Sequence, residues 1–337
     1  MVVFLPIKCY NNKGDRKMSK DFLKGVITPM FTPCNEDDSL DETGIRAYVD
    51  FLKDKKVIKA IFPRCGVGKM YTFSFEEIKT ITEIVIDQAG GELAVIPGTA
   101  GVYDQNPEHK PSSQAYTEQT IELSNYARER GAEGVVLVVP SALKPKSEEK
   151  VEETIFNYYR EVSANCNLPI IIYQPPGLEK EYSITPELLK ELIKLKNIAG
   201  MKYSTTNLES FGRIAEVVRD KDFNLIAGAE TVFLSALSLG AVGVIGGGCN
   251  FCPEVLNSIY ENFKAGKIKE AQIAQDRDNR LLSMCEGIDS ALFTFIYAKR
   301  LGYEVKPYSR RGDKSIPEDR YKEIEEALEK AIAPYRQ

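Results

Sequence analysis

The sequence is poor in residues that bind metals. It contains a single histidine, His109, and seven scattered cysteines, of which only Cys249 and Cys252 are spaced as C-x-x-C. A structural zinc site needs a second pair of such ligands, so the composition argues against one. We expect these two cysteines to lie in a turn before a helix, with a redox role as the weaker alternative.

Long apolar runs and basic stripes are also missing. The apolar runs at 134–140 and 168–173 are far too short to span a bilayer. The net charge is −5 and acidic residues are mixed with basic ones along the chain, so we expect neither nucleic acid nor a membrane as a partner. The apolar run within residues 1–8 is too short for a signal peptide. Together with the odd number of scattered cysteines, this favours reduced thiols in the cytoplasm.

What the sequence does contain is a regular alternation of apolar runs with helix-patterned segments. Continuous apolar runs are typical of parallel strands that are buried on both faces. Eight strand–helix units in about 240 residues predict a (β/α)₈ TIM barrel rather than an open doubly wound sheet. The expected strands lie at 25–31, 60–63, 93–98, 134–140, 169–174, 198–202, 223–228 and 241–245.

Residues remain on both sides of the predicted barrel. We expect a flexible N-terminal extension at 1–20, the barrel at 21–266 and a C-terminal helical appendage at 267–337. Within the appendage, helical patterns at 269–288, 290–301 and 317–333 predict helices that pack against the barrel. No segment has the composition of a domain linker.

The reactive groups are expected at the C-terminal ends of the barrel strands. Lys202 ends the sixth run and Tyr173 ends the fifth, so the two side chains should be neighbours. Burial favours a neutral lysine, and a neutral amine can form a Schiff base with a carbonyl substrate. A phenol beside it can pass protons. The alternatives are a lysine that extends into water and a tyrosine that only fills the barrel mouth.

Two glycine-containing loops flank this pair in the predicted barrel. Gly66, Val67 and Gly68 follow the second strand, and their backbone N–H groups can approach the carboxylate of a keto acid, unless they form only a tight turn. The run 246–248 is either a phosphate cradle or a close-packed cover over the barrel mouth, which we favour. Arg64 and Lys69 flank the first loop, and we favour solvated charges over substrate ligands.

Together these motifs resemble a known superfamily. The resemblance rests on the glycine loop after the second strand, the apolar-apolar-Tyr-x-x-Pro run at 171–176, the Gly-x-Lys-x-Ser-Thr motif at 200–205, and the Leu-Gly-x-x-Gly-x-Ile pattern at 239–245. Over residues 25–301 the sequence resembles the dihydrodipicolinate synthase and N-acetylneuraminate lyase superfamily.

This resemblance implies a class I aldolase-type barrel, usually a tetramer built from dimers. In such a barrel Lys202 would form an imine with pyruvate or another 2-oxo acid, and Tyr173 would relay protons. Gly66, Val67, Gly68 and Ile245 would contact the substrate. The resemblance implies no metal and no organic cofactor, and we expect a homo-oligomer, either a dimer or a tetramer.

The sequence departs from the family pattern in the second-strand loop. The family loop usually reads Gly-Thr-Thr-Gly-Glu or Gly-Ser-Thr-Gly-Glu, whereas residues 65–69 read Cys-Gly-Val-Gly-Lys. The interface tyrosine and the substrate-binding arginine of dihydrodipicolinate synthase are also missing near 140–143 and 177–180. These differences favour a sugar-acid lyase or dehydratase. The alternatives are a dihydrodipicolinate synthase with altered site residues, a non-catalytic paralogue that binds a keto acid, and a phosphate-binding barrel.

Overall fold

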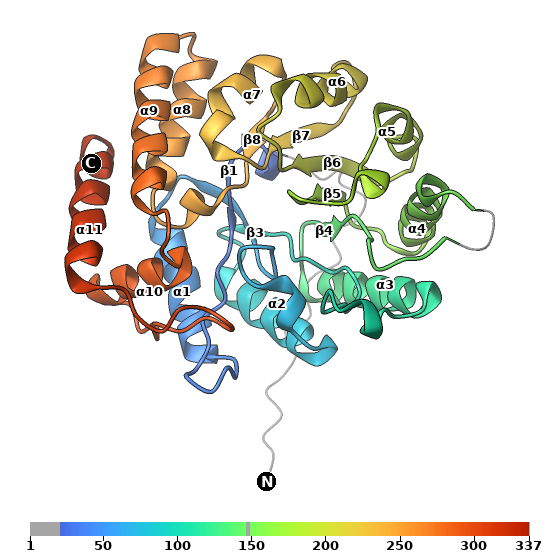
Figure 1. Ribbon diagram of the computed structural model, residues 1–337, viewed down its shortest axis with the longest axis horizontal. Helices are drawn as coiled ribbons and strands as arrows, with labels where there is room; N and C mark the ends of the chain where they lie inside the picture. The colour runs from blue at the N-terminus through green and yellow to red at the C-terminus, as the bar shows by residue number, and fades with distance from the viewer. Residues whose placement is uncertain (1–20, 146–148, 337) are drawn as a thin grey trace.

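The computed structural model describes residues 21–145 and 149–336, and within these ranges eight parallel strands form a barrel (Figure 1). The strands pair in the order β3-β2-β1-β8-β7-β6-β5-β4. A parallel bridge between Gly98 and Val136 joins the two ends of this series, β3 and β4. The predicted TIM barrel is therefore confirmed. The strands are β1 Gly25–Pro29, β2 Ile58–Phe62, β3 Ala94–Val95, β4 Val135–Val138, β5 Ile170–Gln174, β6 Ile198–Tyr203, β7 Asn224–Ala227 and β8 Gly243–Val244.

A ring of helices covers the outside of the barrel, each following its strand in the chain (Figure 1). Local signals set where they begin and end: Ser74 and Glu77 form the predicted capping box of α2, and Gly131 ends α3 in the left-handed conformation. These helices are α1 Glu42–Asp54, α2 Phe75–Ala89, α3 Ser113–Arg130, α4 Val151–Asn165, α5 Pro186–Leu192, α6 Leu208–Val218, α7 Phe233–Leu239 and α8 Pro253–Lys264. Short 3₁₀ helices complete these elements: η1 Asp21–Leu23, η2 Met70–Thr72, η3 Pro107–His109, η4 Lys180–Tyr182, η5 Glu230–Val232, η6 Gly247–Asn250 and η7 Ala333–Tyr335.

Strands β3 and β8 are shorter than the apolar runs predicted. Pro97 has no N–H to donate, so regular pairing in β3 stops before it, although its carbonyl accepts a hydrogen bond from Val136 N–H at 2.9 Å. After β8 only Ile245 N–H still bonds to β7, through the Ala227 carbonyl. The chain then turns into η6. Both runs remain extended, but each provides only two residues of regular ladder.

Three more helices follow the barrel, at the places where the sequence predicted them. They are α9 Ile268–Met284, α10 Ser290–Arg300 and α11 Glu318–Ile332. Figure 1 shows α9 lying beside α8, with α11 on its outer side. The Phe295 ring of α10 packs edge-on against Tyr48 of α1, with ring centres 5.2 Å apart. These helices therefore share apolar contacts with the barrel. The predicted extension at 1–20 lies outside the described residues.

No helix within 21–145 or 149–336 is long and apolar enough to cross a membrane.

Candidate active site

Lys202 and Tyr173 stand side by side at the C-terminal ends of β6 and β5. The two residues are register partners in the sheet, and the lysine Nζ lies 4.3 Å from the centre of the tyrosine ring. Phe62 of β2 contributes a second ring, 5.8 Å from the same nitrogen. Lys202 is only 4% exposed and Tyr173 only 5% exposed. The alternative of a lysine that extends into water is therefore wrong.

Burial controls the electrostatics of this pair. It lowers the pKa of Lys202 to about 8, because a charged amine loses its hydration in the barrel. Within the described residues no carboxylate forms an ion pair with Lys202, so nothing in direct contact restores the lost stabilisation of the charge. Burial also raises the pKa of Tyr173, so the phenol keeps its proton. The result is an amine that loses its proton more readily than a solvated lysine, beside a neutral phenol.

The pair opens into a cavity of about 740 Å³ at the barrel mouth. The predicted substrate-binding residues Gly66, Val67 and Ile245 line it, whereas Gly68 does not. The lining comprises Pro29, Gly66, Val67, Tyr71, Tyr103, Gln105, Pro107, Lys110, Ser141, Tyr173, Pro175, Pro176, Gly177, Leu178, Glu179, Lys202, Ser204, Gly228, Ile245, Gly246 and Gly247. Tyr71 and Tyr103, two phenols that sequence reasoning did not single out, thus share the cavity with Tyr173.

At the two glycines of the second-strand loop, different neighbours leave no room for a side chain. A Cβ on Gly66 would lie 2.9 Å from the Tyr173 hydroxyl oxygen, so the glycine lets that phenol approach the loop. A Cβ on Gly68 would lie 2.5 Å from the Met30 carbonyl. The Gly68 N–H bonds to Cys65 Sγ at 3.3 Å and is therefore used inside the loop. The N–H of Gly66 makes no hydrogen bond within the described residues.

The expectation that Arg64 is a solvated loop charge is wrong. Arg64 is 2% exposed and does not line the cavity, so neither a solvated charge nor a substrate ligand describes it. Its guanidinium donates to the carbonyls of Met70, Gly98 and Gly101 at 3.2–3.3 Å, and also to that of Ala100. Burial lowers its pKa to about 10. Arg64 therefore ties the second-strand loop to the chain that follows β3. Lys69 is partly exposed and does not line the cavity.

The glycine run after β8 surrounds a buried acid, Glu230 of η5, which sequence reasoning missed. Gly248 N–H donates to both carboxylate oxygens at 3.0 Å, and a Cβ on Gly246 would lie 1.9 Å from Oε2. A carboxyl group within the chain already occupies this cradle and takes the place that a phosphate would need. The only sequence signal for Glu230 is an acidic residue soon after the seventh strand.

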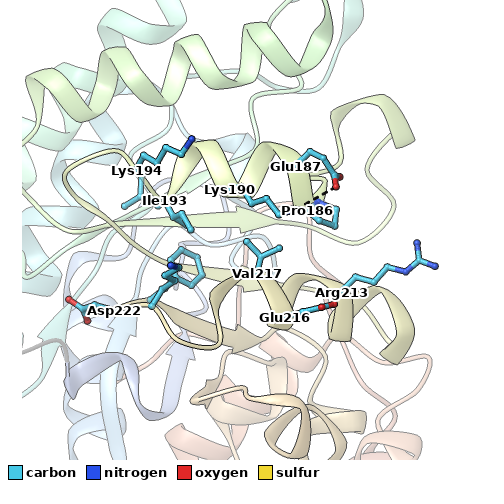
Figure 2. Close-up of a pocket in the computed structure, with 12 residues that line it drawn as sticks. Pro186, Glu187, Lys190, Ile193, Lys194, Arg213, Glu216, Val217 and Asp222 are labelled. Carbon is cyan, nitrogen blue, oxygen red and sulfur yellow. Dashed lines mark ion pairs between the residues drawn. The ribbon is translucent and has the colours of Figure 1, made fainter.

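A second hollow, of about 980 Å³, lies between α5 and α6 outside the barrel (Figure 2). Apolar side chains such as Ile193 and Val217 lie between charged ones, and Glu187 pairs with Lys190 at 3.8 Å. Neither Lys202 nor Tyr173 lines this hollow. It is therefore separate from the cavity that Lys202 and Tyr173 line.

The cysteines among the described residues are free thiols. Those at 34, 65, 166, 249, 252 and 285 are free and buried, while Cys9 lies outside the described residues. Cys249 is in η6 and Cys252 immediately precedes α8, which is the turn that their spacing predicted. Within 21–145 and 149–336 no three Cys, His, Asp or Glu side chains are grouped so as to hold a metal ion.

Comparison with known proteins identifies the family to which this barrel belongs. The family model of the Dihydrodipicolinate synthetase family matches residues 22–331. The chain belongs to this family. Among its relatives, an uncharacterised DapA-like lyase from Pyrococcus furiosus is 30% identical over 312 residues, which cover 91% of this chain and 97% of the relative. A 4-hydroxy-tetrahydrodipicolinate synthase from Methanothrix thermoacetophila is 31% identical over 252 residues, or 74% of this chain and 77% of the relative.

Solved structures of the family share the fold. N-acetylneuraminate lyase from Mycoplasma synoviae aligns with a TM-score of 0.76 at 22% identity, over 93% of this chain and 99% of that one. YagE from E. coli K12, solved in complex with pyruvate, aligns with a TM-score of 0.75 at 23% identity, over 91% and 98%. The predicted resemblance to this superfamily is therefore confirmed, and at these identities the structural similarity concerns the fold.

Proposed function

We propose that this family member is a Schiff-base-forming lyase, either an aldolase or a dehydratase, that acts on pyruvate or on a 2-oxo sugar acid. The observation that carries the proposal is the buried amine of Lys202 next to the Tyr173 phenol, where both residues line the cavity. An amine with a lowered pKa is the nucleophile that imine chemistry requires. Membership of a family in which one structure holds pyruvate supports the same substrate class.

The proposed reaction begins with attack of the neutral Lys202 amine on the C2 carbonyl of the keto acid. The carbinolamine then loses its hydroxyl as water, for which Tyr173 supplies the proton. The backbone N–H groups of Gly66 and Val67 would hold the substrate carboxylate, and Ile245 would pack against its apolar end. Gly68 has no such role, because its N–H is already bonded to Cys65.

The size of the cavity favours a second reactant or a long keto acid. Pyruvate would fill only part of about 740 Å³, in a class of pockets that commonly hold much larger ligands. The lining of the cavity also carries polar groups, among them Lys110, Ser141 and Glu179. A polyhydroxylated sugar acid would find hydrogen-bond partners there. This supports sugar-acid chemistry over the synthase reaction named for some relatives.

Trapping with pyruvate tests the imine. Incubation with pyruvate and cyanoborohydride, followed by peptide mass spectrometry, should show a reduced pyruvyl group on Lys202, and Lys202→Ala should abolish it. The matched control is Lys55→Ala. The Lys55 side chain is 10% exposed but pairs with Glu254 at 3.2 Å, so it should not react, and its loss should leave labelling unchanged. A wild-type protein without a Lys202 adduct would refute the proposal.

A substrate panel separates the possible reactions. The wild-type protein would be incubated with 2-oxo sugar acids, and with pyruvate plus aspartate semialdehyde. Cleavage or dehydration of a sugar acid is the expected outcome. Product from the semialdehyde would instead support a dihydrodipicolinate synthase with altered site residues. An adduct without turnover on any substrate would support a non-catalytic paralogue that binds keto acids.

A further inference from the structure

The polar side chains that line the cavity gather on one side of the barrel. Strands β1, β7 and β8 and the segments after them contribute only side chains without hydrogen-bonding groups: Pro29, Gly228, Ile245, Gly246 and Gly247. Strands β3, β4 and β5 are consecutive in the barrel, and with the segments after them they contribute Tyr103, Gln105, Lys110, Ser141, Tyr173 and Glu179. A substrate tail that forms hydrogen bonds with side chains therefore extends toward β3, β4 and β5.

Lys110 and Glu179 bring opposite charges to this side of the cavity. Lys110 lies in the loop after β3 and Glu179 in the loop after β5, and both side chains line the same cavity as Lys202. Within residues 21–145 and 149–336 neither of the two forms an ion pair, with the other or with a third residue. Both charges therefore remain available to a ligand.

The loop after β4 holds the cation and the segment that carries the acid. Lys110 Nζ donates a hydrogen bond to the Ser141 carbonyl at 3.0 Å and makes no other within the described residues. An ammonium group has three N–H donors, so two remain for a ligand. The Tyr182 hydroxyl of η4, which begins just after Glu179, donates to the Leu143 carbonyl of the same loop at 2.8 Å.

The hydrogen-bonding capacity of this pair defines the tail that fits it. An ammonium group only donates and a carboxylate only accepts, whereas a hydroxyl group does both. Two neighbouring hydroxyls can thus accept from Lys110 and donate to Glu179. A phosphate or a second carboxylate offers acceptors alone, so it would satisfy Lys110 but leave Glu179 facing a like charge without a donor. Such a mismatch lowers the affinity for the wrong ligand.

We propose that Lys110 and Glu179 make the site selective for 2-oxo acids with an uncharged, hydroxylated tail. Lys110 donates to one tail hydroxyl and Glu179 accepts a hydrogen bond from another, while the carboxylate end of the substrate stays at Gly66 and Val67. Glu179 disfavours tails that end in a phosphate or a second carboxylate. This inference rests on the proposed imine chemistry and deepens it by naming the substrate class. Neither side chain makes or breaks a covalent bond.

Competition for the imine on Lys202 tests this selectivity, whichever reaction follows the imine. The protein would be labelled with isotopically marked pyruvate and cyanoborohydride, so that adducts derived from a competitor differ in mass. The competitors differ only in their terminal group: a 2-oxo-3-deoxy sugar acid with a terminal hydroxyl, its phosphate ester and its dicarboxylate. The hydroxyl acid should halve the labelling at a concentration about 10- to 100-fold lower than the other two, as expected for hydrogen bonds to charged groups.

Two variants test the two side chains separately. Glu179→Gln introduces an amide that also donates, so the phosphate ester should gain about tenfold relative to the hydroxyl acid. Lys110→Met removes the donors and should weaken the hydroxyl acid by about tenfold. Each value is taken relative to labelling of the same variant by pyruvate alone. The matched controls are Glu181→Gln and Lys180→Met, exposed neighbours that do not line the cavity, and both should keep the wild-type order of competitors.

The outcomes separate this inference from the proposed function. A phosphate ester or dicarboxylate that competes as well as the hydroxyl acid would overturn the selectivity. An unchanged preference in Glu179→Gln or in Lys110→Met would do the same, and so would a lack of competition by all three acids while pyruvate labels Lys202. Absence of pyruvate labelling in the wild type would instead refute the proposed function itself.

Discussion

At the scale of single residues, the lowered pKa of Lys202 follows from what the side chain does not contact. Lys202 is buried and Lys55 is largely buried, and both have aromatic rings nearby. Lys55 has a carboxylate at 3.2 Å, whereas Lys202 has none within ion-pair distance among the described residues. Desolvation is therefore the largest influence on Lys202, and it favours the neutral amine.

The pH dependence of labelling should report this directly. Because the pKa of Lys202 is lowered to about 8, the neutral fraction grows as the pH rises through that value. The rate of cyanoborohydride-dependent labelling with pyruvate should increase between about pH 7 and pH 9 and then level off. Rates measured by mass spectrometry across this range test the expectation. A rate that keeps rising to about pH 10.5 would mean that Lys202 behaves like a solvated lysine.

At the scale of elements, the glycine run at the start of η6 must leave room for the side chain of Glu230 in η5. Gly246 and Gly247 are adjacent in the chain, yet only the first contacts the Glu230 carboxylate closely: an added Cβ would lie 1.9 Å from Oε2 at Gly246 and 3.8 Å from Oε1 at Gly247. The backbone at Gly246 is extended, so alanine is sterically excluded there by the acid and not by its own torsion angles.

This difference between neighbours can be measured. Gly246→Ala should lower the free energy of unfolding by about 1–3 kcal/mol, because the carboxylate must move or the chain must shift. Gly247→Ala should change it by less than about 0.5 kcal/mol. Urea unfolding followed by circular dichroism would compare the two. Equal effects would show that close packing on Glu230 does not constrain the glycine run.

At the scale of the whole molecule, the C-terminal helices pack against the barrel and form hydrogen bonds with it. Phe295 packs against Tyr48 of α1 and Phe31 after β1, and Gln275 of α9 bonds to η5 and α7. The division between a barrel at 21–266 and an appendage at 267–337 remains a prediction from the sequence. These contacts indicate that the two parts depend on each other.

We therefore expect a single unfolding transition. Guanidinium unfolding followed by far-ultraviolet circular dichroism and by tyrosine fluorescence should give coincident curves, because losing the appendage would remove α9 from Glu230. Hydrogen exchange should protect the amides of α9 and α10 about as strongly as those of α8. An early, separate transition of the C-terminal helices would contradict this. Sedimentation of the same sample would test the predicted dimer or tetramer.

The sequence by itself determined the barrel and the pairing of Lys202 with Tyr173. Both follow from repeating local patterns: alternating strands and helices set the topology, and parallel strands bring their C-terminal ends to one rim. Lys202 and Tyr173 end consecutive strands, so their proximity needed no knowledge of distant contacts. The capping box of α2 and the turn at Cys249 were predictable for the same reason.

Only the tertiary structure decided the roles of Arg64 and Glu230. Arg64 looked like a loop charge because its partners, the carbonyls of residues 98–101, come from the next strand–helix unit. Glu230 looked like an ordinary acid because Gly248 and Gln275, which fix it, lie on other elements. Whether a charged side chain is buried depends on what packs over it, and local sequence patterns do not contain that information.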